Sequence, residues 1–370
     1  MRSNELNRRH FLAATASTAL AACGVPALCP NTVVGASEPT GRGSQRLSIE
    51  QLHRWESLRY GMFIHFGMAT MLGVDFTAGN EPATTFAPDR LDVDQWVSVA
   101  RDAGMRYAVL TAKHVTGHCL WPSRHTDYTV ANSTNKTNVV EAFCKSCEKQ
   151  GVLPGLYYNA TCDNHHRFGS KTIFEGKLFP ARKNDAKLPP FTTSLYQTFM
   201  TAQVTELLTQ FGPIAETWID MPGPLGRGYR KFLYDEIARL QPQTVIIYNA
   251  HRFVRPYRFN VDYAWPSDVS TLEFCGNYHG VQPSPFEPAK WQEIEGKQYY
   301  MPGELCDVIG QYWFARDVDK TRSDEALLTE FDGCRAAGVN LLLNVPPKKN
   351  GLISDDMVTA LMRLRKNARI

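Results

Sequence analysis

The carboxylate of Asp220 is the group in this sequence that is best placed for catalysis. It closes the apolar run 213–220, and Met221-Pro222-Gly223-Pro224 forces the chain out of an extended conformation directly afterwards. Gly212 ends the helical stretch that precedes the run. Asp220 is therefore predicted to stand at the C-terminal tip of a strand, where barrels of parallel strands carry their catalytic groups. The alternative is an aspartate that caps the following turn.

Polar side chains end several other apolar runs. One such residue is usually a satisfied structural group, but six together are harder to explain, because buried polar groups need partners. A barrel of parallel strands would bring them into one bowl. The predicted strand-end residues are His65, His114, Tyr157 or Tyr158, Asp220, Asn249 with Arg252, and Glu304.

Two carboxylates that flank a small pocket are what glycoside hydrolysis requires. One stays ionised to attack the anomeric carbon or to activate water, and the other holds a proton for the leaving oxygen. Asp220 suits the first role, and a glutamate further along the chain could fill the second. Metal chemistry is disfavoured, because His114 and His118 flank a strand end and no third ligand is nearby in the sequence. Nor is there a glycine-rich phosphate loop of Rossmann or Walker type.

Strands and helices alternate from Trp55 onward. Near-continuous apolar strands joined by helical crossovers indicate a parallel sheet. Eight of them in roughly 310 residues predict an α/β fold, a single (β/α)8 TIM-like barrel, with a doubly wound open sheet as the alternative. The predicted strands cover residues 61–67, 107–111, 152–158, 213–220, 244–248, 261–265, 299–306 and 339–345, and the predicted helices cover 92–103, 139–150, 191–210, 228–240 and 323–337.

The composition is that of a globular chain with little net charge. It has 370 residues, 43% of them hydrophobic, and a net charge of +3. Since no basic cluster with interleaved aromatics is present, nucleic acid is not expected as a partner. Cys144 and Cys147 lie inside a helical pattern and are interpreted as packing residues, with a disulfide or redox pair as the alternative.

The N-terminus is predicted to be an export signal. Asn7-Arg8-Arg9-His10-Phe11-Leu12 matches a twin-arginine pattern, and the apolar run that follows is too short to span a bilayer. We expect a signal over residues 1–22, a flexible leader over 23–45 and the barrel domain over 46–370. The predicted location is the periplasm or cell surface of a bacterium, without an integral membrane span. Because Leu20-Ala21-Ala22-Cys23 fits a lipobox, a lipid anchor at Cys23 is the alternative to a freely soluble product.

From Trp55 to Ile353 the sequence resembles one family, the α-L-fucosidases of glycoside hydrolase family 29. The resemblance lies in motifs that occur along the chain in the same order as in the family, and together they are specific for it. They are Gly61-Met62-Phe63-Ile64-His65-Phe66-Gly67; Phe86-Ala87-Pro88 with Leu91-Asp92-Val93-Asp94-Gln95-Trp96; Leu110-Thr111-Ala112-Lys113-His114 with Leu120-Trp121-Pro122-Ser123; Gly155-Leu156-Tyr157-Tyr158; Trp218-Ile219-Asp220; Glu304-Leu305-Cys306 with Ile309 and Trp313; and the stretch 340–353.

This resemblance implies a retaining exo-hydrolase that acts on terminal α-L-fucose of a glycan, without cofactor or metal. Asp220 would be the nucleophile and Glu304 the acid/base residue, with their carboxyl groups roughly 5 Å apart. Glu273, Glu287 and Glu293 are the alternative acids, each expected in a loop. The residues expected to line the sugar pocket are His65, Asp75, His114, Tyr158, Trp218 and Arg252.

Several positions depart from the family pattern. Val115 and Thr116 replace a His and an acid after His114, and Met221 replaces the Gly that follows the nucleophile. The family's Glu-Trp pair becomes Asp75-Phe76, and Gly303 replaces the Trp before Glu304. Since an unmade buried polar pair costs about 1–3 kcal/mol, we expect weakened fucose affinity, with L-galactose or a modified fucose as alternative substrates.

Other functions stay open at this point. A non-catalytic glycan-binding protein with a degenerate pocket is the main alternative, although binding alone does not need both carboxylates. A metal-dependent amidohydrolase on the same barrel is a weaker alternative. We also expect the catalytic domain without the family's usual C-terminal β-sandwich.

Overall fold

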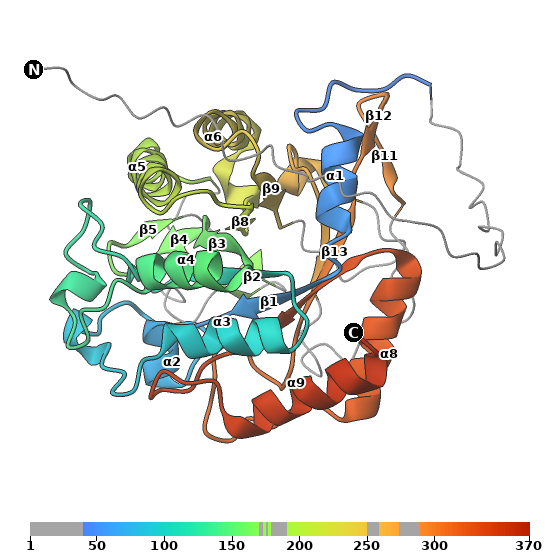
Figure 1. Cartoon of the computed structure of the whole chain (residues 1–370). Helices are drawn as coiled ribbons and strands as arrows, with labels where there is room; N and C mark the ends of the chain where they lie inside the picture. Colours follow the sequence, from blue (N-terminus) through green and yellow to red (C-terminus); the bar gives the residue numbers. More distant parts are fainter. Residues whose placement is uncertain (1–39, 170–172, 175–176, 179–190, 250–258, 274–288) are drawn as a thin grey trace, which may run out of the picture. The chain divides into compact units, whose positions relative to one another are not determined.

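The structure is a computed structural model and describes residues 40–169, 173–174, 177–178, 191–249, 259–273 and 289–370. It confirms the predicted (β/α)8 barrel: eight parallel strands form one sheet in the order β10-β13-β14-β1-β2-β3-β8-β9 (Figure 1). These strands are β1 (Tyr60–Ile64), β2 (Tyr107–Lys113), β3 (Leu153–Asn159), β8 (Glu216–Asp220), β9 (Val245–Tyr248), β10 (Ser270–Glu273), β13 (Gly303–Val308) and β14 (Asn340–Asn344).

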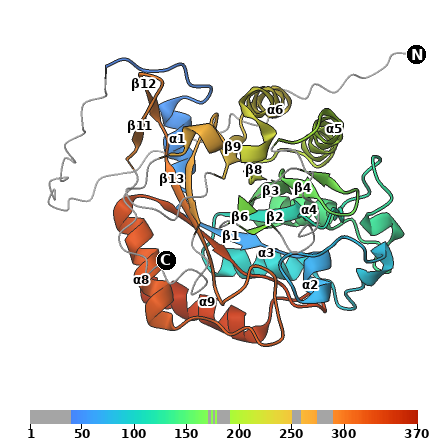
Figure 2. The ribbon, with the colours of Figure 1, turned by 180° about the vertical axis from the view of Figure 1, so that it is seen from behind.

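Helices alternate with the strands and pack outside the sheet, and neighbouring helices in the sequence, such as α3 with α4 and α5 with α6, lie side by side (Figures 1 and 2). Capping residues in the sequence set where these helices begin and end. Asp92 caps α3 by accepting from the amide of Gln95, and Gly151 ends α4 in the left-handed conformation. The helices are α1 (Ile49–Glu56), α2 (Met68–Leu72), α3 (Val93–Asp102), α4 (Val139–Gln150), α5 (Ser194–Gln210), α6 (Arg227–Leu240), α7 (Val261–Ala264), α8 (Asp324–Ala337) and α9 (Asp355–Ala368).

Alternation along the strands divides the core into two parts. Outward-facing side chains pack under the helices, and inward-facing ones fill the barrel itself, so the interior is a packed core and not a pore. The inward set includes Phe63, Tyr107, Tyr157, Trp218 and Leu342. Because side chains alternate with a period of two, the residues next to these in the sequence face the helices.

The predicted sixth strand at 261–265 is wrong. Those residues form the short helix α7, and the sixth barrel strand is β10, Ser270–Glu273. A short apolar run does not distinguish a strand from one helical turn by periodicity alone. The predicted seventh strand also divides, because residues 299–306 end one hairpin strand and begin β13.

Short antiparallel hairpins are inserted between elements of the barrel. The pair β11 (Trp291–Ile294) and β12 (Lys297–Tyr300) precedes β13 and lies beside α1 in both views (Figures 1 and 2). The region after β3 carries β4 (Cys162–Asp163) with β5 (Phe168–Gly169), and β6 (Ile173–Phe174) with β7 (Lys177–Leu178).

Several predictions fall outside the described residues. These are the export signal, the leader as far as residue 39, Cys23, Arg252 and Glu287. Within the described part of the chain, every helix is too short or too polar to cross a bilayer. Cys144 and Cys147 are buried on α4, and each is a free thiol.

Candidate active site

Asp220 ends β8, as the sequence predicts, and its carboxylate is fixed by three donors. The hydroxyl of Tyr157 donates to Oδ2 at 2.7 Å, while the side-chain amide of Asn249 and the backbone N–H of Met221 donate to Oδ1, each at 2.9 Å. The side chain is 8% exposed. These three donors hold the Asp220 carboxylate in one orientation at the mouth of the barrel, by which we mean the C-terminal ends of the eight strands.

A second carboxylate lies beside Asp220. Glu273 ends β10, and its Oε2 accepts from the same Asn249 Nδ2, also at 2.9 Å. Two bonds of 2.9 Å through one nitrogen place the two acceptor oxygens at most about 6 Å apart (twice 2.9 Å). Carboxyl groups of retaining glycosidases stand about 5–5.5 Å apart, and those of inverting enzymes about 6.5–9.5 Å. The bound of about 6 Å applies to one pair of oxygens, and it makes Asp220 and Glu273 close neighbours, as the carboxylates of a glycosidase must be.

Glu304 is not where we expected it. It lies second in β13, opposite Thr271 and Asn340, and its side chain is 0% exposed. Glu273 is opposite Cys306, two residues further along β13, so Glu304 lies about 6–7 Å deeper in the barrel at 3.3 Å per residue. The structure therefore places Glu304 below the mouth, whereas Asp220 ends β8 at the mouth, and the acid/base role of Glu304 stays a prediction.

Glu304 instead belongs to a buried network beneath the mouth. Its carboxylate accepts from Trp218 Nε1 at 2.9 Å and from the Tyr107 hydroxyl at 2.8 Å. Glu216, the first residue of β8, accepts from Trp55 Nε1 at 2.9 Å. Burial raises the pKa of Glu304 to about 7, against the two donors, which lower it. Burial and the charge of Glu304 raise the pKa of Glu216 well above its usual range.

Two predicted pocket residues face elsewhere. Tyr158 points to the helix layer and donates to Gln203 on α5 at 2.8 Å, because it is out of phase with the inward-facing Tyr157. Trp218 lies within the barrel at 2% exposure, stacked against Tyr157 with ring centroids 5.6 Å apart. Trp218 therefore supports the floor of the site, and Tyr157 takes the place we gave to Tyr158.

The two predicted histidines do meet at the mouth. Their ring centroids are 6.1 Å apart, and His114 stacks on Tyr157. His65 Nδ1 is 2.8 Å from Asn344 Oδ1, whereas the buried His114 Nδ1 has no hydrogen-bond partner among the described residues. Burial lowers the pKa of His114 to about 4, although Asp220 opposes this, and burial takes the pKa of His65 well below 6.5. Both rings are neutral near pH 7, and the unpaired nitrogen is suited to a sugar hydroxyl.

An aromatic wall stands next to His65. Trp313 and Phe314 lie 4.9 Å and 5.2 Å from it between centroids, and Trp313 is partly exposed. Asp75 is held behind this wall: its oxygens accept from the Phe314 N–H at 3.2 Å and from Arg316 at 3.1 Å. Burial raises the pKa of Asp75, and these two donors oppose the shift. Since Asp75 is engaged within the protein, it positions the wall.

Two residues that depart from the family pattern, Val115 and Met221, lie in contact with the same small cluster. Val115 and Met221 pack with Cys162 in a small buried cluster. Met221 holds a left-handed backbone conformation, φ 49°, where the pattern has Gly. An apolar pair thus replaces a His and a Gly together, beside the nucleophile candidate.

The described residues hold no group of three or more His, Cys, Asp or Glu side chains that could bind a metal ion. His118 turns away from His114, and its Nε2 lies 2.9 Å from the hydroxyl of Ser133. These two histidines therefore do not form the metal pair that their spacing invites.

Tyr157 and Glu273 stand at the site, although the sequence offers only weak signals for them. Tyr157 has a signal, since Gly155, Tyr157 and Asn159 share one face of β3. Glu273 ends the stretch Ser270-Thr271-Leu272-Glu273, which has one apolar residue and is too short to stand out as a strand. Asn249, a predicted strand-end residue, is the group that joins Asp220 to Glu273.

Comparison with known proteins identifies relatives of this chain. A family model described as "Alpha-L-fucosidase" matches residues 79–366. Alpha-L-fucosidase 1 of Arabidopsis thaliana is 31% identical over 328 residues, which cover 85% of this chain and 58% of that protein. This chain thus spans less than two thirds of the length of that relative.

Solved structures are similar as well. Alpha-L-fucosidase isoenzyme 1 from Paenibacillus thiaminolyticus matches with a TM-score of 0.68 and 25% identity, over 86% of this chain and 75% of that one. A glycoside hydrolase 29 family member from an unknown rumen bacterium matches with a TM-score of 0.66 and 25% identity, over 89% of this chain and 57% of that one.

Proposed function

Because this chain belongs to the α-L-fucosidase family, we propose that it is a retaining exo-glycoside hydrolase that releases terminal α-L-fucose from glycans. The observation that carries the proposal is the pair of carboxylates, Asp220 and Glu273, that share the amide of Asn249 at the barrel mouth. The shared amide keeps the two carboxylates close enough to act on one glycosidic bond, which supports the proposal.

In the first step Asp220 attacks the anomeric carbon, and a covalent glycosyl ester forms as the glycosidic bond breaks. Glu273 gives its proton to the departing oxygen, so the leaving group departs as a neutral alcohol. In the second step Glu273 takes a proton from water, the hydroxide attacks the same carbon, and Asp220 is released. The sugar keeps its configuration because two inversions occur at one carbon.

The remaining groups at the mouth would bind the sugar. The unpaired Nδ1 of His114 is available to a ring hydroxyl, and the partly exposed Trp313 offers a flat apolar face. Most residues lining a small-molecule site are apolar or aromatic, and a few polar groups fix the orientation of the ligand. The neutral His65 and the apolar wall fit that description.

The experiment is hydrolysis of an aryl α-L-fucoside, with azide added to two variants. With Asp220→Ala, azide replaces the missing nucleophile and gives the inverted β-L-fucosyl azide. With Glu273→Ala, azide attacks the glycosyl ester and gives the retained α product. An aryl α-L-galactoside assayed in parallel decides between the two L-sugars. Wild-type protein that turns over no fucoside would overturn the substrate assignment, and a retained product from Asp220→Ala would overturn the role of Asp220.

The proton donor needs a separate comparison, since the sequence favoured Glu304. Glu273→Gln should spare substrates with activated leaving groups and slow natural glycans by about 10²–10⁴-fold. Glu304→Gln should affect both substrate types equally, because that carboxylate lies below the mouth. The reverse pattern would return the acid role to Glu304.

We also infer export through the twin-arginine route, on the strength of Arg8-Arg9 and the apolar run after them. Replacing both arginines by lysine should retain the protein in the cytoplasm of a bacterial host, as measured by cell fractionation. A change of Cys23 to Ser separates a lipidated product from a soluble one, because only the lipidated form partitions with membranes.

A further inference from the structure

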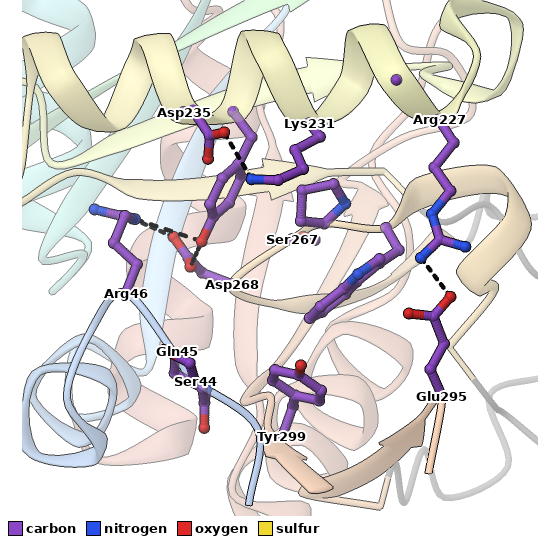
Figure 3. Close-up of a pocket in the computed structure, with 14 residues that line it drawn as sticks. Ser44, Gln45, Arg46, Arg227, Lys231, Asp235, Ser267, Asp268, Glu295 and Tyr299 are labelled. Atoms are coloured by element: carbon purple, nitrogen blue, oxygen red, sulfur yellow. Dashed lines mark hydrogen bonds and ion pairs between the residues drawn. The ribbon is translucent and has the colours of Figure 1, made fainter. Parts of the chain in front are cut away.

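A cavity of about 750 Å³ lies beside helix α6, and its lining runs from the first turn of that helix to Asp268, just before β10 (Figure 3). Its walls come from α6, from the connection between α7 and β10, from the β11–β12 hairpin and from residues 44–46. None of its lining residues belongs to the catalytic pair or to the sugar-binding groups described above. Its volume falls in the range of ligand-binding sites, about 300–1,000 Å³.

The walls are held in place before any ligand binds. Segment 41–46 runs along the hairpin, where Gly43 donates to the Gln298 carbonyl at 2.9 Å and Gln45 exchanges two bonds with the Tyr300 backbone. Arg46 reaches the carbonyls of Pro242 and Thr244 before β9. A preformed site loses less conformational entropy on binding than a mobile one.

The charges around the cavity cancel. Three cations and three carboxylates line it, and each cation pairs with an acid: Arg46 with Asp268, Arg227 with Glu295, and Lys231 with Asp235 at 2.7 Å (Figure 3). An anionic ligand such as phosphate would need cations that are not already paired. A lipid or other apolar ligand would desolvate this polar rim without replacing its hydrogen bonds. A neutral ligand with many hydroxyls suits paired charges, because guanidinium and carboxylate groups keep spare donor and acceptor positions.

Three aromatic side chains line the cavity: Tyr234, whose hydroxyl is bound by Asp268, and the adjoining Trp265 and Tyr299. Trp265 and Tyr299 are both half-buried, with ring centroids 4.7 Å apart at 63°. The carbonyl of Trp265 is fixed by Arg230 at 3.0 Å, and the Tyr299 ring is packed against Gly43. A sugar ring has one face of C–H groups, which stacks on such an aromatic, and a rim of hydroxyls, which suits the charged pairs around it.

We propose that this groove, formed by Trp265, Tyr299 and the ion pairs around them, is a second glycan-binding site for a neutral oligosaccharide stretch. A glycan bound at this groove would keep its terminal sugars near the barrel mouth. Binding at the groove would therefore raise the local concentration of substrate without a new catalytic contact. The choice of a glycan rests on the proposed function, whereas binding at the groove can be measured without catalysis.

The test is affinity electrophoresis of the full chain carrying Asp220→Ala, so that a glycan in the gel stays intact. Fucosylated xyloglucan, fucoidan and mucin serve as separate probes, and the mobility is compared with that in a gel without polysaccharide. We expect fucosylated xyloglucan, the neutral probe, to retard the protein more than the anionic fucoidan and mucin do, and Trp265→Ala to weaken that binding by about tenfold. The matched control is Phe232→Ala, which removes an exposed aromatic of α6 that does not line the groove and should leave the retardation unchanged.

A second variant guards against a folding defect at Trp265. Arg227 and Glu295 are 55% and 57% exposed, so the double change to Ala leaves the core intact and should also weaken retardation.

In the active chain, Trp265→Ala should leave kcat/KM for an aryl fucoside unchanged and raise KM for the retained polysaccharide. The groove proposal is overturned if no glycan retards the chain, if Trp265→Ala and the Arg227/Glu295 variant bind as the parent does, or if inorganic phosphate displaces the glycan. Failure of fucoside hydrolysis alone would overturn the proposed function and leave this binding result standing.

Discussion

The hydroxyl of Tyr157 donates a 2.7 Å hydrogen bond to the carboxylate of Asp220 across two neighbouring strands. The Tyr157 ring also stacks on Trp218, whose indole N–H is bound by Glu304 at 2.9 Å. The nucleophile candidate is thus connected, through one aromatic stack, to a carboxylate in the barrel interior. Catalytic groups need support from residues whose own rotamers are locked by packing, and this stack provides it.

Removing the Tyr157 hydroxyl should impair catalysis more than stability. In Tyr157→Phe, Oδ2 of Asp220 loses its side-chain donor, and hydrogen bonds to charged groups are worth about 1.5–3 kcal/mol. We expect kcat/KM for an aryl fucoside to fall roughly 10- to 150-fold. Tyr158→Phe is the matched control, because it removes an adjacent hydroxyl that faces Gln203 and should leave kcat/KM unchanged. Equal losses in the two variants would contradict this assignment of strand faces.

The pH dependence of stability should change in Glu304→Gln. The folded protein holds the proton of Glu304 up to about pH 7, whereas the unfolded chain releases it near the ordinary value of 4.5. The folded state therefore binds more protons in this window, and wild-type stability falls as the pH rises from 4.5 to 7, by roughly a few kcal/mol from this group. The variant lacks this contribution.

Urea unfolding at several pH values between 4 and 8 measures this effect as the difference in free energy of unfolding between the two chains. Wild type should lose stability relative to the variant as the pH rises across the window. A constant difference from pH 4 to 8 would show that Glu304 titrates like an exposed glutamate.

Lys113 and Asp163 form a fully buried ion pair at 2.9 Å, both 0% exposed. Burial raises the pKa of Asp163, but Lys113 and His166 together outweigh burial and hold that pKa below its usual range. Lys113→Met would leave a buried carboxylate without its main partner, at a cost of about 3–5 kcal/mol. The control, Lys145→Met, breaks an exposed pair with Glu141 and should cost at most about 0.5 kcal/mol. Similar free energies of unfolding for the two variants would rule out a special role for the buried pair.

Met221→Gly should change the free energy of unfolding in two opposite ways, through the backbone conformation and through the loss of a buried side chain. Glycine relieves a left-handed conformation that costs an L-residue roughly 1–2 kcal/mol. It also empties a site where the Met side chain is 4% exposed, and losses of buried Met are typically about 2–5 kcal/mol. The loss of the buried side chain should outweigh the relief of the backbone. The variant should therefore be less stable than wild type by about 1–3 kcal/mol in thermal or urea unfolding. A stabilised variant would show that the contacts with Val115 and Cys162 contribute little.

The amino-acid sequence by itself determined the barrel, the family and the strand-end position of Asp220. These follow from local patterns: apolar runs, helix-ending glycines and the Pro-Gly-Pro turn after Asp220 act over a few neighbouring residues. It also identified His65, His114 and Asn249 as strand-end groups, and the structure brings all three to the mouth.

Only the tertiary structure decided which tyrosine and which glutamate reach the site. Tyr157 and Tyr158 differ by one position, and register across β2, β3 and β8 fixes which one points inward. Glu304 and Glu273 are both strand residues, but Glu304 is second in β13 and Glu273 ends β10, so they lie at different depths of the same barrel. The depth of a side chain depends on how strands are staggered around the closed sheet, and that stagger is set by packing between residues distant in the chain.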